Sequence, residues 1–285
     1  MKKLIFNHIK NLSIATLLIF GYATGSAQEK KHEFAVSVGG VFSSITYDLE
    51  GGNVDQGEGI GFGLRYSYYL SENWSIGLGA EYQSYKSAAH LNNFSGAYIT
   101  TDVENESFEF RYSGSNYNEK QTLRYMNIPL TVQFETSGDD EVRWYIAGGV
   151  KAGIAIDAEY ETSITNLSTS GYYPQYNTEL FDPKFMGFGQ FSEVDAGKQS
   201  LDTKMSWSGT LETGFKQAVG NRGWAYLGIF VDYGFTKISN DSSKNLIAYP
   251  QGVPVNLKYN SVLDTPQAKD TRLIAYGVKF RLAFN

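Results

Sequence analysis

Apolar and polar side chains alternate with a period of two residues along most of the chain, most clearly in the last segment, 273–284. Every second position there is apolar or aromatic, and the positions between hold small residues or the bases Lys279 and Arg281. Such alternation is typical of a β-strand with two unlike faces, and no segment carries a convincing helical stripe. The pattern predicts eight long strands, at about 33–47, 59–71, 74–87, 121–136, 142–160, 204–218, 223–238 and 269–284.

The connections between the predicted strands fall into two classes by length. Three are tight turns, at 71–73, 137–141 and 219–223. The longer ones are predicted at about 48–58, 88–120, 161–203 and 239–268. An even number of strands places both ends of the strand region beside the short turns and all the longer connections opposite them. Short periplasmic turns and long extracellular loops are typical of outer-membrane β-barrels.

The two faces of the predicted strands indicate which side meets lipid. One face carries large aliphatic and aromatic side chains, whereas the other is rich in Gly and Ser and holds the charges. A narrow barrel interior suits the small residues and cannot hold so many large aromatics. The outward aromatics also gather near the strand ends, where they resemble interfacial girdles. They are Phe34, Trp74, Phe134, Trp144, Phe215 and Phe284 near the short turns, and Tyr82, Tyr160, Trp207 and Phe235 near the long connections.

The sequence therefore predicts an all-β fold, an eight-stranded antiparallel transmembrane β-barrel with short periplasmic turns and long extracellular loops. Its strand register should be strict, because a slip of one residue would turn the charged face toward lipid. Basic residues at mid-depth cost roughly 2–4 kcal/mol each. Summed over the strands, this penalty exceeds the ~5–15 kcal/mol that stabilises a typical fold.

The inward face is the main candidate site, and we predict that its charges pair inside the barrel. The predicted lumen network consists of Arg65, Glu81, Glu135, Arg143, Lys151, Asp157, Glu212, Lys216, Asp232, Lys279 and Arg281. An eight-stranded interior is just wide enough for side chains to fill. Nearly balanced charge in that space favours an ion-paired plug, with a narrow polar conduit as the alternative. Lys279 and Arg281 are expected to meet carboxylates such as Asp232.

The third long connection carries an unusual density of aromatic residues. They are Tyr172, Tyr173, Tyr176, Phe181, Phe185, Phe188 and Phe191. Exposed aromatics at this density are typical of a contact surface, so a partner or ligand outside the cell is one interpretation. The other is that the connection packs on its own barrel rim as a lid. The sequence leaves both open.

The N-terminal 27 residues differ from the rest of the chain. Three lysines precede a short apolar run, 12–20, and small residues occupy 25–27. This pattern predicts a secretory signal peptide cleaved before Gln28, with an uncleaved membrane anchor as the alternative. Removing 1–27 changes the net charge from −6 to −6 − 3 = −9, and this acidity argues against nucleic acid as a partner. Residues 28–285 then form the barrel domain, located in the outer membrane.

Nothing in the sequence indicates catalysis or a cofactor. There is no Cys, which excludes disulfides and zinc-thiolate sites. After cleavage only His32 and His90 remain, and neither has an acid or nucleophile at suggestive spacing. The acidic pair Asp139–Asp140 falls in a predicted periplasmic turn, whereas barrel proteases place such pairs at the outer end. We therefore expect no enzyme activity, no cofactor and no metal.

Two phrases carry a family resemblance: "LRYMNIPLTVQF", 123–134, with its Tyr-x-x-Ile-Pro-Leu core, and "YGVKFRLAF", 276–284. With the signal peptide and eight strands, they resemble the PorT-like group of small outer-membrane β-barrels and, more loosely, the OmpA-like barrel. The resemblance implies an outer-membrane location and, by analogy, a role in a protein secretion or gliding apparatus. The final strand resembles the signal that barrel-assembly machinery recognises, formed here by Tyr276, Phe280, Leu282 and Phe284.

The expected partners follow from this interpretation. They are outer-membrane lipid, the barrel-assembly machinery and a candidate extracellular or secretion-system protein. The chain is expected to be a monomer with a structural or surface-interaction role. A secretion or gliding component and a narrow pore or small-ligand transporter are the alternatives.

Overall fold

Alternating apolar and polar residues form β-strands throughout the computed structural model, which describes residues 31–137, 141–220, 223–240 and 243–285. The predicted signal peptide, 1–27, and the pair Asp139–Asp140 lie outside the described residues. In the part of the chain that is described, no helix has the length and hydropathy to cross a membrane. Residues His32–Asn285 form one unit.

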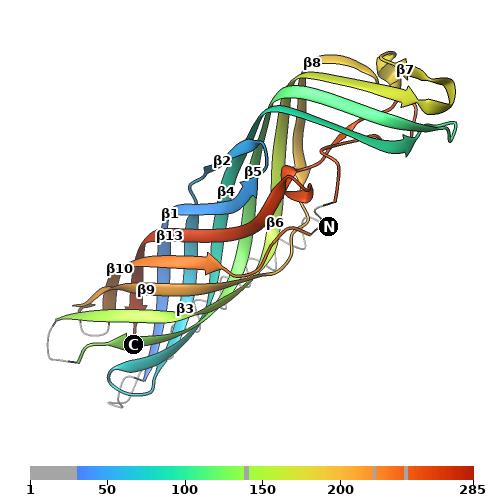
Figure 1. Ribbon diagram of the computed structural model, residues 1–285. Coiled ribbons are helices and arrows are strands. Elements are labelled where there is room, and N and C mark those ends of the chain that lie inside the picture. The colour runs from blue at the N-terminus through green and yellow to red at the C-terminus, as the bar shows by residue number, and fades with distance from the viewer. Residues whose placement is uncertain (1–30, 138–140, 221–222, 241–242) are drawn as a thin grey trace, which may run out of the picture. The chain divides into compact units, whose positions relative to one another are not determined.

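Eight long strands correspond to the eight predicted ones. They are β1 His32–Leu49, β3 Ile60–Tyr69, β4 Trp74–Thr101, β5 Ser107–Glu135, β6 Val142–Tyr173, β9 Ser206–Val219, β10 Gly223–Gly234 and β13 Ala268–Phe284. Shorter elements are β2 Gly52–Gln56, β7 Thr178–Leu180, β8 Gly189–Ser200, β11 Ile247–Ala248, β12 Lys258–Tyr259, and the 3-10 turns η1 Pro174–Tyr176, η2 Lys184–Met186 and η3 Val262–Asp264. The prediction of an all-β antiparallel fold is confirmed (Figure 1).

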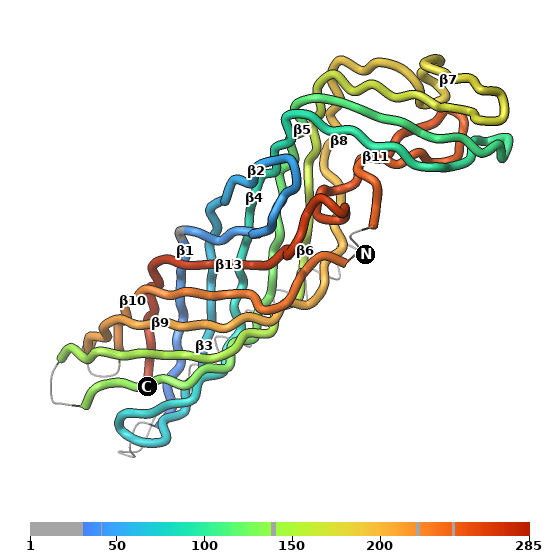
Figure 2. Tube along the Cα trace, in the orientation of Figure 1, coloured from blue at the N-terminus to red at the C-terminus, as the bar shows by residue number. Residues whose placement is uncertain are grey.

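Backbone pairing links the long strands in one order. The main sheet has eleven strands, and its pairing runs β4–β3–β1–β13–β10–β9–β6–β5, with a further pairing of β5 to β4. β1 pairs with β13 from Phe34↔Phe284 to Leu49↔Ala268, so the first and last long strands are neighbours. The trace in Figure 2 shows these two strands side by side.

The three short connections lie at one end of this sheet, which we call the turn end. The register shows this, because Phe284 pairs with Phe34 and Gly223, Trp74 pairs with Phe134, and Val142 pairs with Gln217. The predicted sorting of short and long connections therefore agrees with the register.

Three strands are much longer than predicted. β4 continues to Thr101 and β5 begins at Ser107, so the predicted connection 88–120 is mainly a β-ribbon with a five-residue turn, 102–106. β6 likewise continues to Tyr173, and the predicted connection 161–203 contains β7 and β8, which pair with β6. The sequence pattern did not predict these longer strands, because their outer residues are polar and neither face of this region is uniformly apolar.

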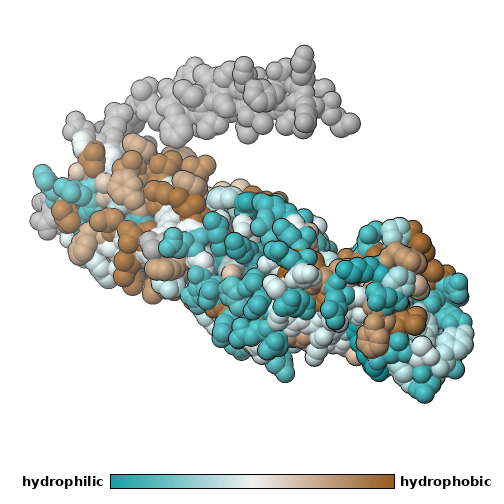
Figure 3. Space-filling model, turned by 90° about the horizontal axis from the view of Figure 1, so that it is seen from above, coloured by the Kyte–Doolittle hydropathy of each residue, from teal (hydrophilic) through white to brown (hydrophobic). Residues whose placement is uncertain are grey.

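We call this region the extension: 86–101 of β4, 107–121 of β5 and 159–173 of β6, with β2, β7 and β8. Its interior is apolar, unlike the interior near the turn end. The largest core cluster contains Phe108, Phe110, Tyr117, Phe188 and Tyr249, all buried. Toward the turn end the inward residues are instead charged or polar, and the large outward residues are exposed, including Leu64 at 62% and Ile229 at 63%. The same strands therefore reverse their polarity along their length. On the outside, Figure 3 shows apolar surface beside hydrophilic surface.

A β-bulge accompanies this reversal on β6 and overturns two predictions. The register between β5 and β6 shifts at Arg124 and Tyr125, where Arg124 pairs with Asp157 and Tyr125 with Ala155. The bulge changes which residues point inward. Asp157 was predicted to face the lumen, but its carboxylate forms an outward ion pair with Arg124. Tyr160 was predicted in the outer girdle, but it is buried in the core.

Candidate functional site

The inward charges between the turn end and the extension form the candidate site. At its centre, the Lys151 ammonium from β6 lies between two carboxylates, 2.9 Å from Glu81 on β4 and 2.7 Å from Asp232 on β10. All three side chains are buried. One ammonium therefore ties together three strands that are not neighbours in the sheet.

A second group continues from this centre toward the turn end. Lys279 lies 3.6 Å from Glu81 and 3.5 Å from Glu212, and Arg281 forms a close ion pair with Glu212. The Tyr145 hydroxyl donates to Glu212 at 2.8 Å, and the Arg281 guanidinium lies 5.3 Å from the centre of the Tyr145 ring. Both bases therefore meet lumen carboxylates, as predicted, but the carboxylate named as an example, Asp232, is paired with Lys151 instead.

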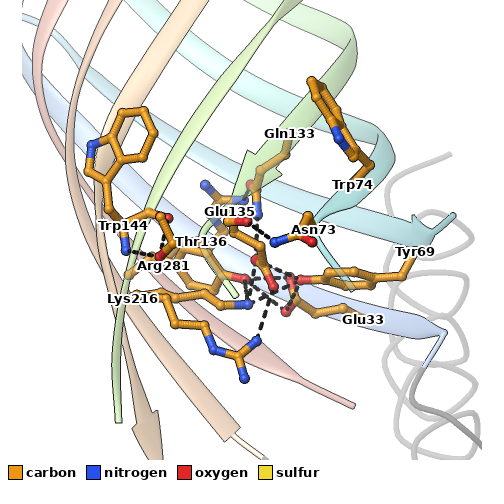
Figure 4. Close-up of polar contacts among 12 residues, drawn as sticks. Glu33, Tyr69, Asn73, Trp74, Gln133, Glu135, Thr136, Trp144, Lys216 and Arg281 are labelled. Atoms are coloured by element: carbon orange, nitrogen blue, oxygen red, sulfur yellow. Dashed lines mark hydrogen bonds and ion pairs between the residues drawn. The ribbon is translucent and has the colours of Figure 1, made fainter. Parts of the chain in front are cut away.

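A third group lies at the turn end (Figure 4). The Lys216 ammonium is 2.5 Å from Glu135, and the Tyr69 hydroxyl donates to Glu135 and to Glu33, at 3.2 Å in each case. Tyr226 also donates to Glu33, at 2.9 Å. Arg143 lies 3.6 Å from Glu135, and its side chain is 26% exposed. These contacts connect six strands across the interior.

Glu33 was not predicted, although it follows the period-two pattern of β1 and is almost completely buried. Its neighbour Phe34 was assigned to the outward face, so the same alternation places Glu33 inward, but Glu33 was left out of the predicted network. Two tyrosine hydroxyls, from Tyr69 and Tyr226, donate to it. The predicted network contained charged residues only, so these two inward tyrosine hydroxyls were missed as well.

Arg65 lies beside the central group with different surroundings. Its Nε and Nη2 atoms are buried and have no hydrogen-bond partner among the described residues. It lines a cavity of about 40 Å³ together with Glu81, Lys151, Glu212 and Lys279. A space of this size holds no more than a few water molecules. The structure therefore brings together ten of the eleven predicted network residues and leaves out Asp157.

The predicted aromatic surface is divided by the structure into buried and exposed parts. Tyr173 and Phe188 are buried, and Phe188 stacks on Tyr249 with ring centres 5.8 Å apart. Tyr172 and Phe191 are partly buried. Tyr176, Phe181 and Phe185 are 57–60% exposed. We call these three the tip aromatics. Part of the segment packs on the protein itself and part remains available.

The four residues of the predicted assembly signal all lie on the outward face of β13. Tyr276, Phe280 and Phe284 are exposed and Leu282 is partly exposed. Phe284 pairs with Phe34 across the β1–β13 seam. Their placement on one face follows from the period of two, whereas their role in assembly stays a prediction.

A buried carboxyl in the extension, Glu119, was not predicted. It accepts hydrogen bonds from the Ser261 hydroxyl at 2.6 Å, the Val262 amide at 2.9 Å and the Gln121 amide at 2.8 Å, and a close one from Tyr117. Ser261 and Val262 begin η3, in the connection between β10 and β13. Glu119 therefore fastens that connection to β5. Burial raises the pKa of Glu119, and the hydrogen bonds oppose this only in part.

The histidines have ordinary polar partners. His32 Nδ1 is 2.8 Å from the Tyr66 hydroxyl, and His90 lies 2.6 Å from Asn118 and 3.2 Å from Asp55. Over the described ranges, no group of three His, Asp or Glu side chains could hold a metal ion.

Comparison with known proteins identifies the family. A profile of the outer membrane protein beta-barrel domain matches residues 26–240, which is more than half of the chain. The chain therefore belongs to this family of outer-membrane β-barrel proteins. No match was found among the curated proteins.

Three solved structures are similar to this chain at low identity. Neisserial surface protein A (NspA) is 8% identical over 89% of this chain and 95% of its own, with a TM-score of 0.37. OprG from Pseudomonas aeruginosa is 13% identical over 88% and 96%, with a TM-score of 0.34. The translocator domain of the autotransporter NalP from Neisseria meningitidis is 7% identical over 98% and 96%, with a TM-score of 0.23. Because these TM-scores are below 0.5, no conclusion about this chain rests on them.

Lys151→Met should destabilise the protein strongly, because it leaves the buried carboxylates of Glu81 and Asp232 without the ammonium they share. Removing one member of a buried ion pair costs ~3–5 kcal/mol. The measurement is the free energy of unfolding in urea, followed by tryptophan fluorescence in lipid vesicles. Lys198→Met is the control, since Lys198 is 65% exposed and should change stability by less than about 0.5 kcal/mol. Equal stability of Lys151→Met and the unaltered chain would contradict the importance of this contact.

The attachment of η3 should strengthen as pH falls. Because burial raises the pKa of Glu119 in the folded chain, its stabilising contribution is complete below the ordinary carboxyl pKa of about 4.3 and is lost as pH rises through the folded value. The measurement is the rate of proteolysis within 235–267 from pH 4 to 8, corrected with an unstructured peptide. Glu119→Gln should remove the pH dependence. A dependence that persists in Glu119→Gln would show that another group is responsible.

Proposed function

We propose that the chain is a non-enzymatic outer-membrane protein whose eight long strands form a closed transmembrane barrel with a plugged lumen, and whose extension makes contacts outside the cell. The pairing order supports closure, because β5 pairs with β4 and β13 with β1. Closure satisfies the backbone polar groups that lipid cannot satisfy. The signal peptide and the short periplasmic turns belong to the same proposal.

The outward apolar residues indicate which part of the strands the membrane surrounds in this proposal. Side chains such as Leu64, Ile128, Leu211, Phe215 and Ile229 are 49–63% exposed and lie on long strands of the same sheet. Exposed apolar area on this scale is typical of a surface that meets lipid or another protein. Figure 3 shows apolar surface concentrated over one part of the strands and hydrophilic surface over the adjoining part. We place the membrane over the apolar part and the extension outside the cell.

The charge network carries the proposal of a plugged lumen. Its carboxylates meet cations or tyrosine hydroxyls from strands on opposite sides of the interior, and the cavity beside them is about 40 Å³. A hydrated ion needs a wider continuous path. The alternative of a narrow pore or small-ligand transporter therefore has less support than a closed interior.

In planar lipid bilayers the purified protein should give no reproducible, large single-channel conductance. The physical reason is that the Lys151 and Lys216 contacts bridge the interior at two levels. A heat-dependent shift in gel mobility should first show that the barrel is folded. Frequent, uniform openings of such a folded sample would overturn the plug, and a sample recovered in the soluble fraction without the shift would overturn the barrel itself.

The extension carries the proposed contact role. The tip aromatics Tyr176, Phe181 and Phe185 remain exposed although Tyr173 and Phe188 from the same segment are buried. The Tyr176 hydroxyl donates to Glu106 at 2.7 Å, which holds η1 beside the 102–106 turn. The buried Tyr173 and Phe188 anchor the segment to the core. The tip aromatics therefore form an exposed surface in a fixed position. A component of a PorT-type secretion or gliding apparatus, which the resemblance implies, is the alternative use of the same surface.

The triple variant Tyr176→Ser, Phe181→Ser, Phe185→Ser should keep the folded gel mobility but lose cross-linking to neighbouring surface proteins on intact cells. The exposed rings add little to the core, and apolar contact with a partner depends on them. Deletion of 171–191 is less informative, because it also removes the buried Tyr173 and Phe188. The matched control is Phe188→Ser, which should impair folding. Unchanged cross-linking in a folded triple variant would count against the contact role.

Assembly is the last part of the proposal. The outward row Tyr276, Phe280, Leu282 and Phe284 fits a signal read by barrel-assembly machinery before β13 pairs with β1. Once paired, the same row would face lipid as a monomeric barrel requires.

A further inference from the structure

We infer that the outer edge of β4, from Asn92 to Thr101, is a strand-addition site that binds an extended, uncharged segment of another protein. This inference rests on the proposed contact role of the extension and names the kind of partner.

The edge is free because the strands that cover it end early. On that side β4 pairs with β3 from Ser75 to Gln83 and with β2 from Ser87 to Leu91. From Asn93 to Thr101 the pairing is with β5 alone. Over this stretch, no other backbone pairing of β4 occurs among the described residues. Alternate N–H and C=O groups of β4 therefore point away from the sheet, as in any edge strand.

The composition of this edge differs from that of the opposite one. The stretch "NNFSGAYITT", 92–101, contains no charged residue and no proline. The opposite edge of the extension is β8, which carries Glu193, Asp195 and Lys198 and has a register shift against β6. Charges and irregularities are the usual protection of an exposed edge against pairing. One edge is protected and the other is not.

The two faces of the edge strand indicate the pattern of its partner. Phe94 and Tyr98 point to the core, where Phe94 meets Tyr117 with ring centres 5.7 Å apart and the Tyr98 hydroxyl receives the Tyr249 amide at 2.7 Å. Ser95, Ala97 and Ile99 are exposed. A strand added alongside would continue both faces. Its inward positions would therefore be apolar and its outward positions polar, with no charge required.

A cleft beside the edge favours a single extended chain over a second folded sheet. The cleft, of about 360 Å³, is lined by Asn93, Phe94 and Ser95 of β4 and by Leu246, Pro266 and Gln267 of the connection between β10 and β13. Glu50 also lines it, but its carboxylate is 3.0 Å from the Lys269 ammonium. A cleft of this size has room for a single extended chain and too little for the broad approach that a second copy of this protein would need.

The edge also leads to the tip aromatics. β4 ends at Thr101, and the following turn receives the Tyr173 hydroxyl at Asp102 and the Tyr176 hydroxyl at Glu106. A segment paired along β4 would therefore reach the exposed aromatic surface. In strand addition, backbone hydrogen bonds supply affinity and side-chain pockets supply specificity. The tip aromatics would provide the side-chain contacts that give specificity.

Disulfide trapping tests the site, because the chain has no natural Cys. Ser95→Cys places a thiol on the β4 edge, and Ser192→Cys places one on the protected β8 edge as a matched control, both at exposed serines. The probe is a capped peptide of alternating Val and Thr with one central Cys. Ser95→Cys in the folded protein should be trapped at least roughly tenfold faster than Ser192→Cys. N-methylation of alternate peptide amides should abolish the difference, because it removes the donors of one edge.

Three outcomes would overturn the inference. They are equal trapping at the two positions, trapping that N-methylation leaves unchanged, and a dimer in sedimentation that Ser95→Lys converts to a monomer. The last would show that a second copy occupies the edge. The test is independent of the tip aromatics, since failure at the edge leaves the cross-linking result of the triple variant unaffected.

Discussion

Backbone pairing between β1 and β13 is the contact on which the rest of this structure depends. It joins the first long strand to the last, and with the β4–β5 pairing it returns the sheet to its starting strand. Because the register is continuous from Phe34↔Phe284 to Thr46↔Arg272, each side chain on this part of the two strands has an assigned face. The inward charges meet across the interior only under that register. In lipid, such pairing also satisfies the backbone without water.

The same strands serve two environments by reversing their polarity. Near the turn end the interior holds ion pairs such as Lys151–Asp232 and the exterior is apolar, whereas in the extension the interior is apolar and the exterior polar. The bulge at Asp157 accompanies this change on β6. An aqueous exterior requires a dry core, and a lipid exterior permits a polar one. The position of the reversal is therefore a physical indication of where the proposed membrane boundary lies.

The proposed functions follow from where this pairing continues and where it stops. At the level of the charge network every long strand pairs with two others, which supports the proposed closed barrel. In the extension β4 loses its second neighbour after Leu91, and tip aromatics are exposed nearby. Continuous pairing of the long strands favours a stable barrel wall, whereas the unpaired edge of β4 can bind another chain. The buried Glu119, which fastens η3 to β5, keeps the connection beside that edge in place.

The fold class, the eight long strands and the faces of ten of the eleven predicted network residues could be predicted from the sequence, because a period of two is a local property. The sequence could not place Asp157 or Tyr160, since a single bulge reverses the alternation and leaves no local signal. The sequence pattern also failed to predict the parts of β4, β5 and β6 that lie in the extension, because their outer residues are polar. The individual ion pairs, the burial of Glu33 and Glu119 and the free edge of β4 were decided only by tertiary structure. Each of these depends on which strands, distant in sequence, become neighbours across the interior or along the sheet.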